Sequence, residues 1–288
     1  MSGERILALK VDVDTRRGME KGVPSLLATL DEWKARAAFF LSFGPDNSGR
    51  AVFQMIRNPR FLLKMARTNA PGLYGVRTAL YGTLLPAPRI ASAHPALCRE
   101  IESRGHEVEF HAWDHRTWQD GLPRKGAEWI REWFERGVAS YRECLGHRPR
   151  AFGAPAWLLT DAAVRALRAH PWEYLSCTRA AGPFLLAGTG LPEVPSDLPC
   201  LEEVGGRNGA SRILAALDAG GTHVLPVHAE GEGGIWRDAF VEILRGARER
   251  GYEILPLSEV AARIRGCALE ERPFRMVRLP GRAAACAA

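Results

Sequence analysis

Two histidines spaced four residues apart form the part of the sequence best suited to chemistry. They lie in the stretch His111-Ala-Trp-Asp-His115, which follows a predicted strand at 106–111. On one helical turn, side chains at positions i and i+4 share a face, so both imidazoles can reach one metal ion. The early stretch Val11-Asp-Val-Asp-Thr15 offers carboxylates that would complete such a ligand set. These residue types predict a metal-dependent enzyme.

Asp12 and Asp14 alternate along the end of the first predicted strand, so their side chains point to the same side. Two carboxylates this close repel each other, and the pKa of one would rise unless a cation lies between them. A metal ion removes the conflict if one aspartate binds it and the other stays free as a base. The alternative is a pair of turn aspartates that cap the following loop.

His228 ends the predicted strand 222–228 and therefore reaches the same sheet edge as the aspartates. It has no second histidine at ligand spacing, which favours a proton donor over a metal ligand; a structural histidine is the alternative. Glu230 and Glu232 follow on a glycine-rich loop and are predicted to line a polar substrate pocket, unless the loop is simply solvated. Trp113 is predicted to wall the same site, although such rings more often belong to a core.

The elements that must position these residues alternate between strands and helices. Strands are predicted at 6–13, 37–43, 106–111, 151–156, 222–228 and 252–256, and helices at 22–36, 94–104, 126–145, 160–170 and 236–250. This alternation is typical of an α/β fold with parallel strands and helices outside. In such folds the C-terminal ends of the strands carry the active site, which is where the motifs fall.

Three segments break this alternation. Residues 44–88 combine many apolar side chains with arginine and lysine and contain one acidic residue, Asp46. Such a basic amphipathic insert predicts contact with lipid or a membrane surface, while a helical subdomain with a solvated basic rim fits equally well. The Gly- and Pro-rich residues 182–209 predict a long loop at the edge of the site. Residues 267–288 are predicted to be a flexible tail that follows one domain, 1–266.

Composition narrows the class of protein. A chain of 288 residues, 46% hydrophobic and 25% charged, suits one large domain with a full core. The net charge of +6 and the pI near 9.2 favour an anionic partner, such as a phosphorylated substrate, an acidic membrane surface or nucleic acid. Glycine-rich phosphate loops and nucleic-acid-binding modules are missing from the sequence, so nucleic acid is the least favoured partner.

The cysteine pattern predicts the cellular compartment. Six cysteines are scattered without a C-x-x-C pair, which is typical of reduced thiols in a cytoplasmic protein. No secretory signal is expected before the first strand, and no apolar run reaches the roughly 18 residues needed to span a bilayer.

The order of the three motifs, Asp-x-Asp, then His-x-x-x-His, then Leu-x-x-His, resembles the polysaccharide deacetylase family, also called NodB-type carbohydrate esterases. The likeness spans most of the chain and implies a distorted (β/α) barrel. It also implies one divalent metal ion bound by Asp14, His111 and His115, with Asp12 as general base and His228 as general acid. This ligand set suits zinc, manganese, cobalt, nickel or iron about equally.

Within that family the chain most resembles one branch, which removes the formyl group from 4-deoxy-4-formamido-L-arabinose carried on undecaprenyl phosphate. The stretches that carry this likeness are Val11–Gly18, Phe43–Asn47, Leu73–Gly75, His111–His115 and His228–Gly233. The resemblance implies a role in lipid A modification and polymyxin resistance, at the cytoplasmic side of the inner membrane, with the insert 44–88 on the membrane surface. The alternatives are an N-deacetylase of another N-acylated glycan and a catalytically inactive lipid-binding protein.

Two motifs of the family are only partly matched. Where the third motif carries an arginine before a proline and an aromatic residue, this chain has Ala154-Pro-Ala-Trp157, with Arg150 as a displaced substitute. The backbone N–H of Ala156 is expected to stabilise the oxyanion. Where the fourth motif supplies an aspartate, Cys177 stands, and Arg179 is expected to fill part of that gap at the substrate.

Overall fold

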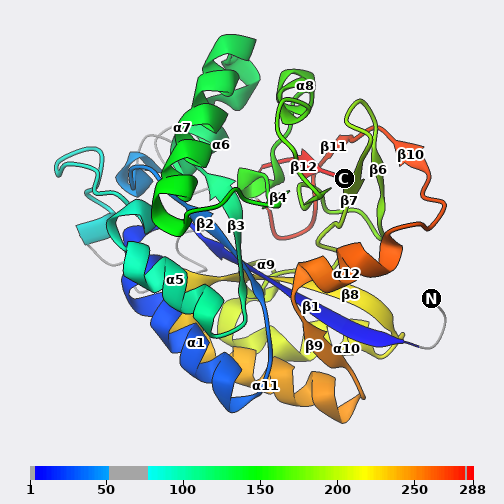
Figure 1. Cartoon of the computed structure of the whole chain (residues 1–288). Helices are drawn as coiled ribbons and strands as arrows, with labels where there is room; N and C mark the ends of the chain where they lie inside the picture. The colour runs from blue at the N-terminus through cyan, green and yellow to red at the C-terminus, as the bar shows by residue number, and fades with distance from the viewer. Residues whose placement is uncertain (1–3, 52–76, 283) are drawn as a thin grey trace.

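Most of the strands form one curved mixed sheet at the centre of the molecule (Figure 1). The computed structural model describes residues 4–51, 77–282 and 284–288. The strands of this sheet are β1 Arg5–Val13, β2 Ala38–Ser42, β3 Glu107–Ala112, β4 Ala151–Phe152, β5 Tyr174–Leu175, β6 Phe184–Leu186, β7 Leu191–Glu193, β8 Gly221–His228, β9 Glu253–Leu255 and β10 Glu271–Arg272. Their order is β10-β6-β7-β5-β4-β3-β2-β1-β8, with β9 also paired to β1, and all pairs are parallel except β6–β7. Because the end strands β8 and β10 do not pair, this is the open, distorted barrel that the sequence predicts.

Helices follow most of the strands, as a parallel sheet requires for its crossovers. They are α1 Val23–Glu32, α5 Pro95–Ser103, α6 His115–Gly121, α7 Ala127–Leu145, α8 Asp161–Leu167, α9 Leu201–Val204, α10 Ala210–Leu217, α11 Arg237–Glu249 and α12 Leu257–Ile264. Helices α1, α5 and α11 lie along one side of the sheet, whereas α12 lies close to β1 and β9 (Figure 1). Each buries an apolar face, which gives the sheet a core on both sides.

The alternation of side chains along β1 separates the core from the site. The odd-numbered residues from Leu7 to Val13 belong to the main core beneath the outer helices. The even-numbered residues Ile6 and Ala8 belong to a second core, closed by apolar residues of α12. Lys10 and Asp12 are the next residues on that face, and both are buried. On this face, strand β1 therefore supplies its first polar side chains where it approaches its C-terminal end.

Two segments differ from the prediction. The predicted loop 182–209 contains the hairpin β6–β7 and helix α9. The predicted flexible tail 267–288 contains β10 and the antiparallel pair β11 Met276–Val277 and β12 Cys286–Ala287. Both residues of β12 are buried, and the carbonyl of Ala287 accepts a hydrogen bond from the backbone of Arg179. Backbone pairing and burial hold this end of the chain against the body of the protein.

The predicted insert 44–88 is described only at its two ends, and its middle, 52–76, lies outside the described residues. Its helical, amphipathic character stays a prediction. On the described flank, the apolar side chain of Leu84 is 81% exposed. Among the described helices, none is long and apolar enough to cross a membrane.

Candidate active site

Strand register places the two proposed acid–base residues next to each other. In the parallel pair β1–β8, Asp12 lies opposite His228, and in the pair β1–β2 it lies opposite Phe40. Asp14 follows one residue after β1, and His111 lies near the end of β3. Parallel strands end at the same edge of a sheet, so these side chains, far apart in sequence, converge.

Asp14, His111 and His115, here called the ligand cluster, lie within reach of one ion. Their candidate ligand atoms all lie within 4.8 Å of one another. The Nε2 of His111 is 3.2 Å from Oδ1 of Asp14, and the Nε2 of His115 is 3.4 Å from Oδ2. The side chain of His111 is 1% exposed, that of His115 15% and that of Asp14 20%, so the cluster is shielded but reachable.

The hydrogen bonds of His111 indicate that a cation fits this cluster. Its Nδ1 lies 2.8 Å from the carbonyl of Gly153, which can only accept, so Nδ1 carries the proton. Nε2 then presents a lone pair to Asp14, whose buried Oδ1 has no hydrogen-bond partner in the described part of the chain. Two acceptors facing each other repel unless a cation lies between them. An aspartate and two imidazoles are suitable donors for a divalent transition metal.

The ionisation of the cluster suits the same purpose. Burial lowers the pKa of His115 to about 4, so its imidazole is neutral near pH 7. Burial alone would raise the pKa of Asp14, but in acid, where the rings are protonated, His115 and His111 attract the carboxylate and hold this pKa well below its usual value, so Asp14 is already ionised when the rings become neutral. Metal binding requires a neutral imidazole and an ionised carboxylate, which is the state these shifts favour.

Neighbouring loops hold the cluster in place. His115 is the first residue of α6, and the preceding Asp114 caps that helix by accepting a hydrogen bond from the backbone of Thr117 at 2.9 Å. The other carboxylate oxygen of Asp114 accepts a hydrogen bond from Asn47 at 2.7 Å. The adjacent Asp46 accepts one from the backbone of Arg16 at 2.8 Å. One loop after β2 thereby braces both the loop of Asp14 and the helix of His115.

Asp12 is held by a buried lysine that the sequence analysis missed. The Nζ of Lys10 lies 2.5 Å and 2.6 Å from the two carboxylate oxygens, and Lys10 is 0% exposed. The same ammonium lies 4.9 Å from the ring centre of Phe40 and 5.3 Å from that of Trp157. The predicted substitute Arg150 instead pairs with Glu109 and Glu107. A lysine in an apolar strand, two residues before an aspartate, is the signal that could have identified this pair.

His228 is surrounded by groups that favour its protonated form. Its side chain forms a compact group with Cys200 and Glu202, whose candidate donor atoms lie within 4.8 Å. Burial alone would lower the pKa of His228, but Cys200, Asp14 and Glu202 outweigh it and raise this pKa well above its usual value. A protonated imidazole next to Asp12 is the arrangement expected of a proton donor.

The loop after β4 brings Trp157, the aromatic residue of the partly matched third motif, to the site. Ala156 and Trp157 have φ angles of 54° and 52°, a left-handed conformation that is costly for residues other than glycine. The ring of Trp157 lies edge-on to His228, with 6.3 Å between ring centres. The guanidinium groups of Arg179 and Arg282 lie 4.8 Å and 4.7 Å from the ring centre of Trp157.

The predicted substrate contacts lie around this site, and their roles stay predictions. The side chain of Arg179 is 4% exposed, pairs with Glu203 at 2.7 Å and donates to two backbone carbonyls, so its guanidinium already has partners. Glu232 accepts a hydrogen bond from the backbone of His228 at 3.0 Å. Trp113 is partly buried and stacks with the guanidinium of Arg89 at 4.4 Å.

Glu230 reinforces the loop that carries Asp14. Its Oε1 accepts hydrogen bonds from the backbone of Asp14 at 3.2 Å and from the backbone and hydroxyl of Thr15 at 2.8 Å and 2.7 Å. Burial and the nearby Asp14 raise the pKa of Glu230 to about 8. The β1 and β8 loops are thus bonded to each other directly behind the ligand cluster.

Comparison with known proteins agrees with the fold and the motifs. A Shewanella sediminis protein named "Probable 4-deoxy-4-formamido-L-arabinose-phosphoundecaprenol deformylase ArnD" is 31% identical over 260 residues. The match covers 88% of this chain and 85% of the length of the Shewanella protein. A Wigglesworthia glossinidia brevipalpis protein of the same name is 29% identical, covering 84% of this chain and 88% of its own. A crystal structure from Mycobacterium smegmatis, assigned to the polysaccharide deacetylases, superposes with a TM-score of 0.64 at 19% identity over 97% of both chains. Residues 2–175 match the polysaccharide deacetylase family, and this chain belongs to it.

Proposed function

We propose that the protein is a metal-dependent deformylase. Its substrate would be 4-deoxy-4-formamido-L-arabinose carried on undecaprenyl phosphate, and its products formate and the 4-amino sugar lipid. Two relatives that are named as probable deformylases of this substrate match most of the chain. The observation that carries the proposal is the ligand cluster, in which an unprotonated imidazole nitrogen faces an unpartnered carboxylate oxygen.

The proposed reaction is hydrolysis of an amide. A divalent ion held by the ligand cluster would polarise the formyl oxygen and lower the pKa of a nearby water molecule. Asp12, oriented by Lys10, accepts a proton from the attacking water. The backbone N–H of Ala156 would stabilise negative charge on the carbonyl oxygen. His228 donates a proton to the sugar nitrogen as the C–N bond breaks, which leaves formate and a free amine.

Two substitutions separate metal binding from proton transfer. We expect His111→Ala to abolish metal binding, measured by calorimetry, because it removes one of three ligands. We expect Asp12→Asn to retain the metal but to lower the rate of formate release by a factor of about 10²–10⁴, the usual contribution of a general base. Chelation and metal add-back serve as the control. An Asp12→Asn protein with ordinary activity would remove the base assignment.

A deacetylase of another N-acylated glycan is the second candidate, because the family itself is named for deacetylation. Parallel assays of the formamido sugar lipid and its acetamido analogue separate the two candidates. A formyl preference supports the deformylase, and an equal or greater rate on the acetyl compound supports the deacetylase.

The cellular role follows from the proposed substrate. Free 4-amino-arabinose on its lipid carrier would serve lipid A modification and hence polymyxin resistance. A lipid-linked substrate requires access to a membrane surface, and we propose peripheral association with the cytoplasmic side of the inner membrane. The basic, apolar composition of the insert 44–88 and the exposed Leu84 support this placement.

A further inference from the structure

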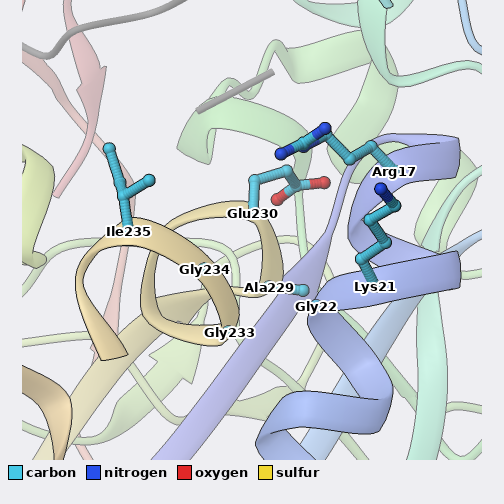
Figure 2. A pocket seen from close by; sticks show the side chains of 8 residues that line it. All are labelled: Arg17, Lys21, Gly22, Ala229, Glu230, Gly233, Gly234 and Ile235. Atoms are coloured by element: carbon cyan, nitrogen blue, oxygen red, sulfur yellow. The ribbon is translucent and has the colours of Figure 1, made fainter. Parts of the chain in front are cut away.

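A small pocket lies next to the candidate active site, between the loops that follow β1 and β8. Figure 2 shows the side chains that line it, with Arg17 and Lys21 on one side and Glu230 and Ile235 on the other. Its lining residues are Arg17, Lys21, Gly22, Ala229, Glu230, Gly233, Gly234 and Ile235. Neither Arg17 nor Lys21 has a role in the proposed proton transfers.

The two cations of this pocket lack a carboxylate partner. Arg17 is partly exposed and Lys21 exposed, and neither forms an ion pair within the described part of the chain. The residues outside that part contain no Asp or Glu, so they cannot supply one. The adjacent Arg16, by contrast, pairs with Glu20 at 2.6 Å, and Glu20 also lies 3.5 Å from His94. No carboxylate therefore lies within ion-pair distance of Arg17 or Lys21 in the described part of the chain, although the carboxyl group of Glu230 lines the same pocket, and both cations can bind an anion.

Glycines let the two loops that form the pocket pack closely against each other. A Cβ on Gly22 would come within 2.1 Å of the carbonyl of Ala229, and one on Gly233 within 2.4 Å of the carbonyl of Gly22, so the two loops touch through bare backbone. A Cβ on Gly234 would meet nothing within 4 Å, which marks the open side. A ligand can approach the cations from this side without displacing a side chain.

Glu230 connects the pocket to the ligand cluster. Its carboxylate lines the pocket, and its Oε1 accepts hydrogen bonds from the backbone of Asp14 and Thr15. A ligand held by Arg17 would therefore lie three residues along the same loop from the metal ligand Asp14. Glu230 thus places the pocket beside the loop that carries Asp14.

We propose that Arg17 and Lys21 form a subsite for the phosphodiester of the lipid-linked sugar substrate. This inference rests on the proposed function and adds to it the residues that would select a phosphorylated substrate over a neutral glycan. A guanidinium and an ammonium without partners are suited to a phosphate group. The partly buried Ile235 supplies an apolar contact for the start of the prenyl chain.

The test compares two soluble substrates in the metal-loaded enzyme. One is the formamido sugar joined by a phosphodiester to a short prenyl chain, and the other is the methyl glycoside of the same sugar, which has no phosphate. The quantity compared is kcat/KM for the phosphodiester divided by kcat/KM for the glycoside. We expect the double variant Arg17→Gln with Lys21→Gln to lower this ratio, with each lost cation contributing a factor of about ten or more. The matched control, Arg165→Gln with Arg168→Gln, removes two exposed charges on and beside α8 and should keep the wild-type ratio.

A binding measurement with a ligand that cannot be hydrolysed tests the subsite independently of deformylase activity. Calorimetry with the short-chain phosphodiester of arabinose lacking the formamide should show binding to the wild type and the control, and loss in the Arg17/Lys21 variant. An unchanged ratio and unchanged binding would overturn the subsite. Formate release from neither substrate by the wild type would overturn the proposed function instead, while the calorimetry still decides the subsite.

Vesicle binding distinguishes the substrate's phosphodiester from bulk lipid headgroups. The Arg17/Lys21 variant should sediment with anionic phosphatidylglycerol vesicles as well as the wild type does. If it loses vesicle binding but keeps the wild-type ratio on the soluble substrates, the two cations contact the membrane surface, and the subsite is wrong.

Discussion

The buried ammonium of Lys10 and the carboxylate of Asp12 form a pair in which each residue depends on the other. Neither group reaches bulk water, and both carboxylate oxygens contact the same Nζ. Removing one partner of a buried ion pair leaves an uncompensated charge, which costs about 3–5 kcal/mol. The pair also fixes the direction of the carboxylate, so the attacking water would meet a base in one orientation.

Replacement of Lys10 tests this dependence. We expect Lys10→Met to lower the free energy of unfolding by about 3 kcal/mol and formate release by about 100-fold, because Asp12 loses its partner and its orientation. Adding Asp12→Asn should recover part of the lost stability, as a double-mutant cycle in urea would measure. Lys10→Arg, which keeps the charge, should retain more activity than Lys10→Met. If Lys10→Met and Lys10→Arg lost the same amount of activity, Lys10 would only fill space.

At the scale of elements, a buried histidine joins two central strands. His106 precedes β3, and its Nδ1 accepts a hydrogen bond at 3.2 Å from the backbone of Ala37, which precedes β2. Burial lowers the pKa of His106 to about 4 from its ordinary 6.5. The folded protein therefore holds this ring neutral where the unfolded chain would begin to protonate it.

This histidine predicts a loss of stability in mild acid. Between pH 6.5 and about 4 the unfolded chain binds more protons at His106, so the free energy of unfolding falls as the pH falls, and this contribution levels off near pH 4. The total is of the order of 3 kcal/mol for a shift of this size. Urea unfolding at pH 7 and pH 5 should show a smaller difference for His106→Gln than for the wild type. If the free energy of unfolding changed equally between pH 7 and pH 5 in both proteins, His106 would not be the source of the loss.

At the scale of the whole molecule, the ligand cluster joins β1, β3 and α6, so ion binding should stabilise the fold. A divalent ion at about 100 times its Kd would add about 2.7 kcal/mol to the free energy of unfolding. We expect zinc or manganese to raise Tm by about 5 °C over chelated protein. His115→Ala should remove most of this rise. A rise that persists in that variant would place the stabilising ion elsewhere.

The sequence predicts the parts of the site that depend on local pattern and strand ends. The strand at 6–13 and the strand ending at His228 appear as β1 and β8, and the His-x-x-x-His spacing brings both rings to Asp14. Lys10 was missed, and Trp157 was noted only as part of a motif, because their importance comes from contacts between strands and loops distant in sequence. The C-terminal strands were missed because each is only two residues long, too short for a pattern; β10 pairs with the distant β6, and β11 pairs with β12.

Those C-terminal strands bear on how the protein should be handled in the laboratory. Arg282 donates a hydrogen bond to the carbonyl of Ala156 at 3.1 Å, pairs with Glu203 at 2.9 Å and lies over the ring of Trp157. A purification tag or fluorescent fusion after Ala288 would pull on this anchored end and, through it, on the loop proposed to steady the oxyanion. The N-terminal side, which enters β1 at the edge opposite the site, is the better attachment point for a tag.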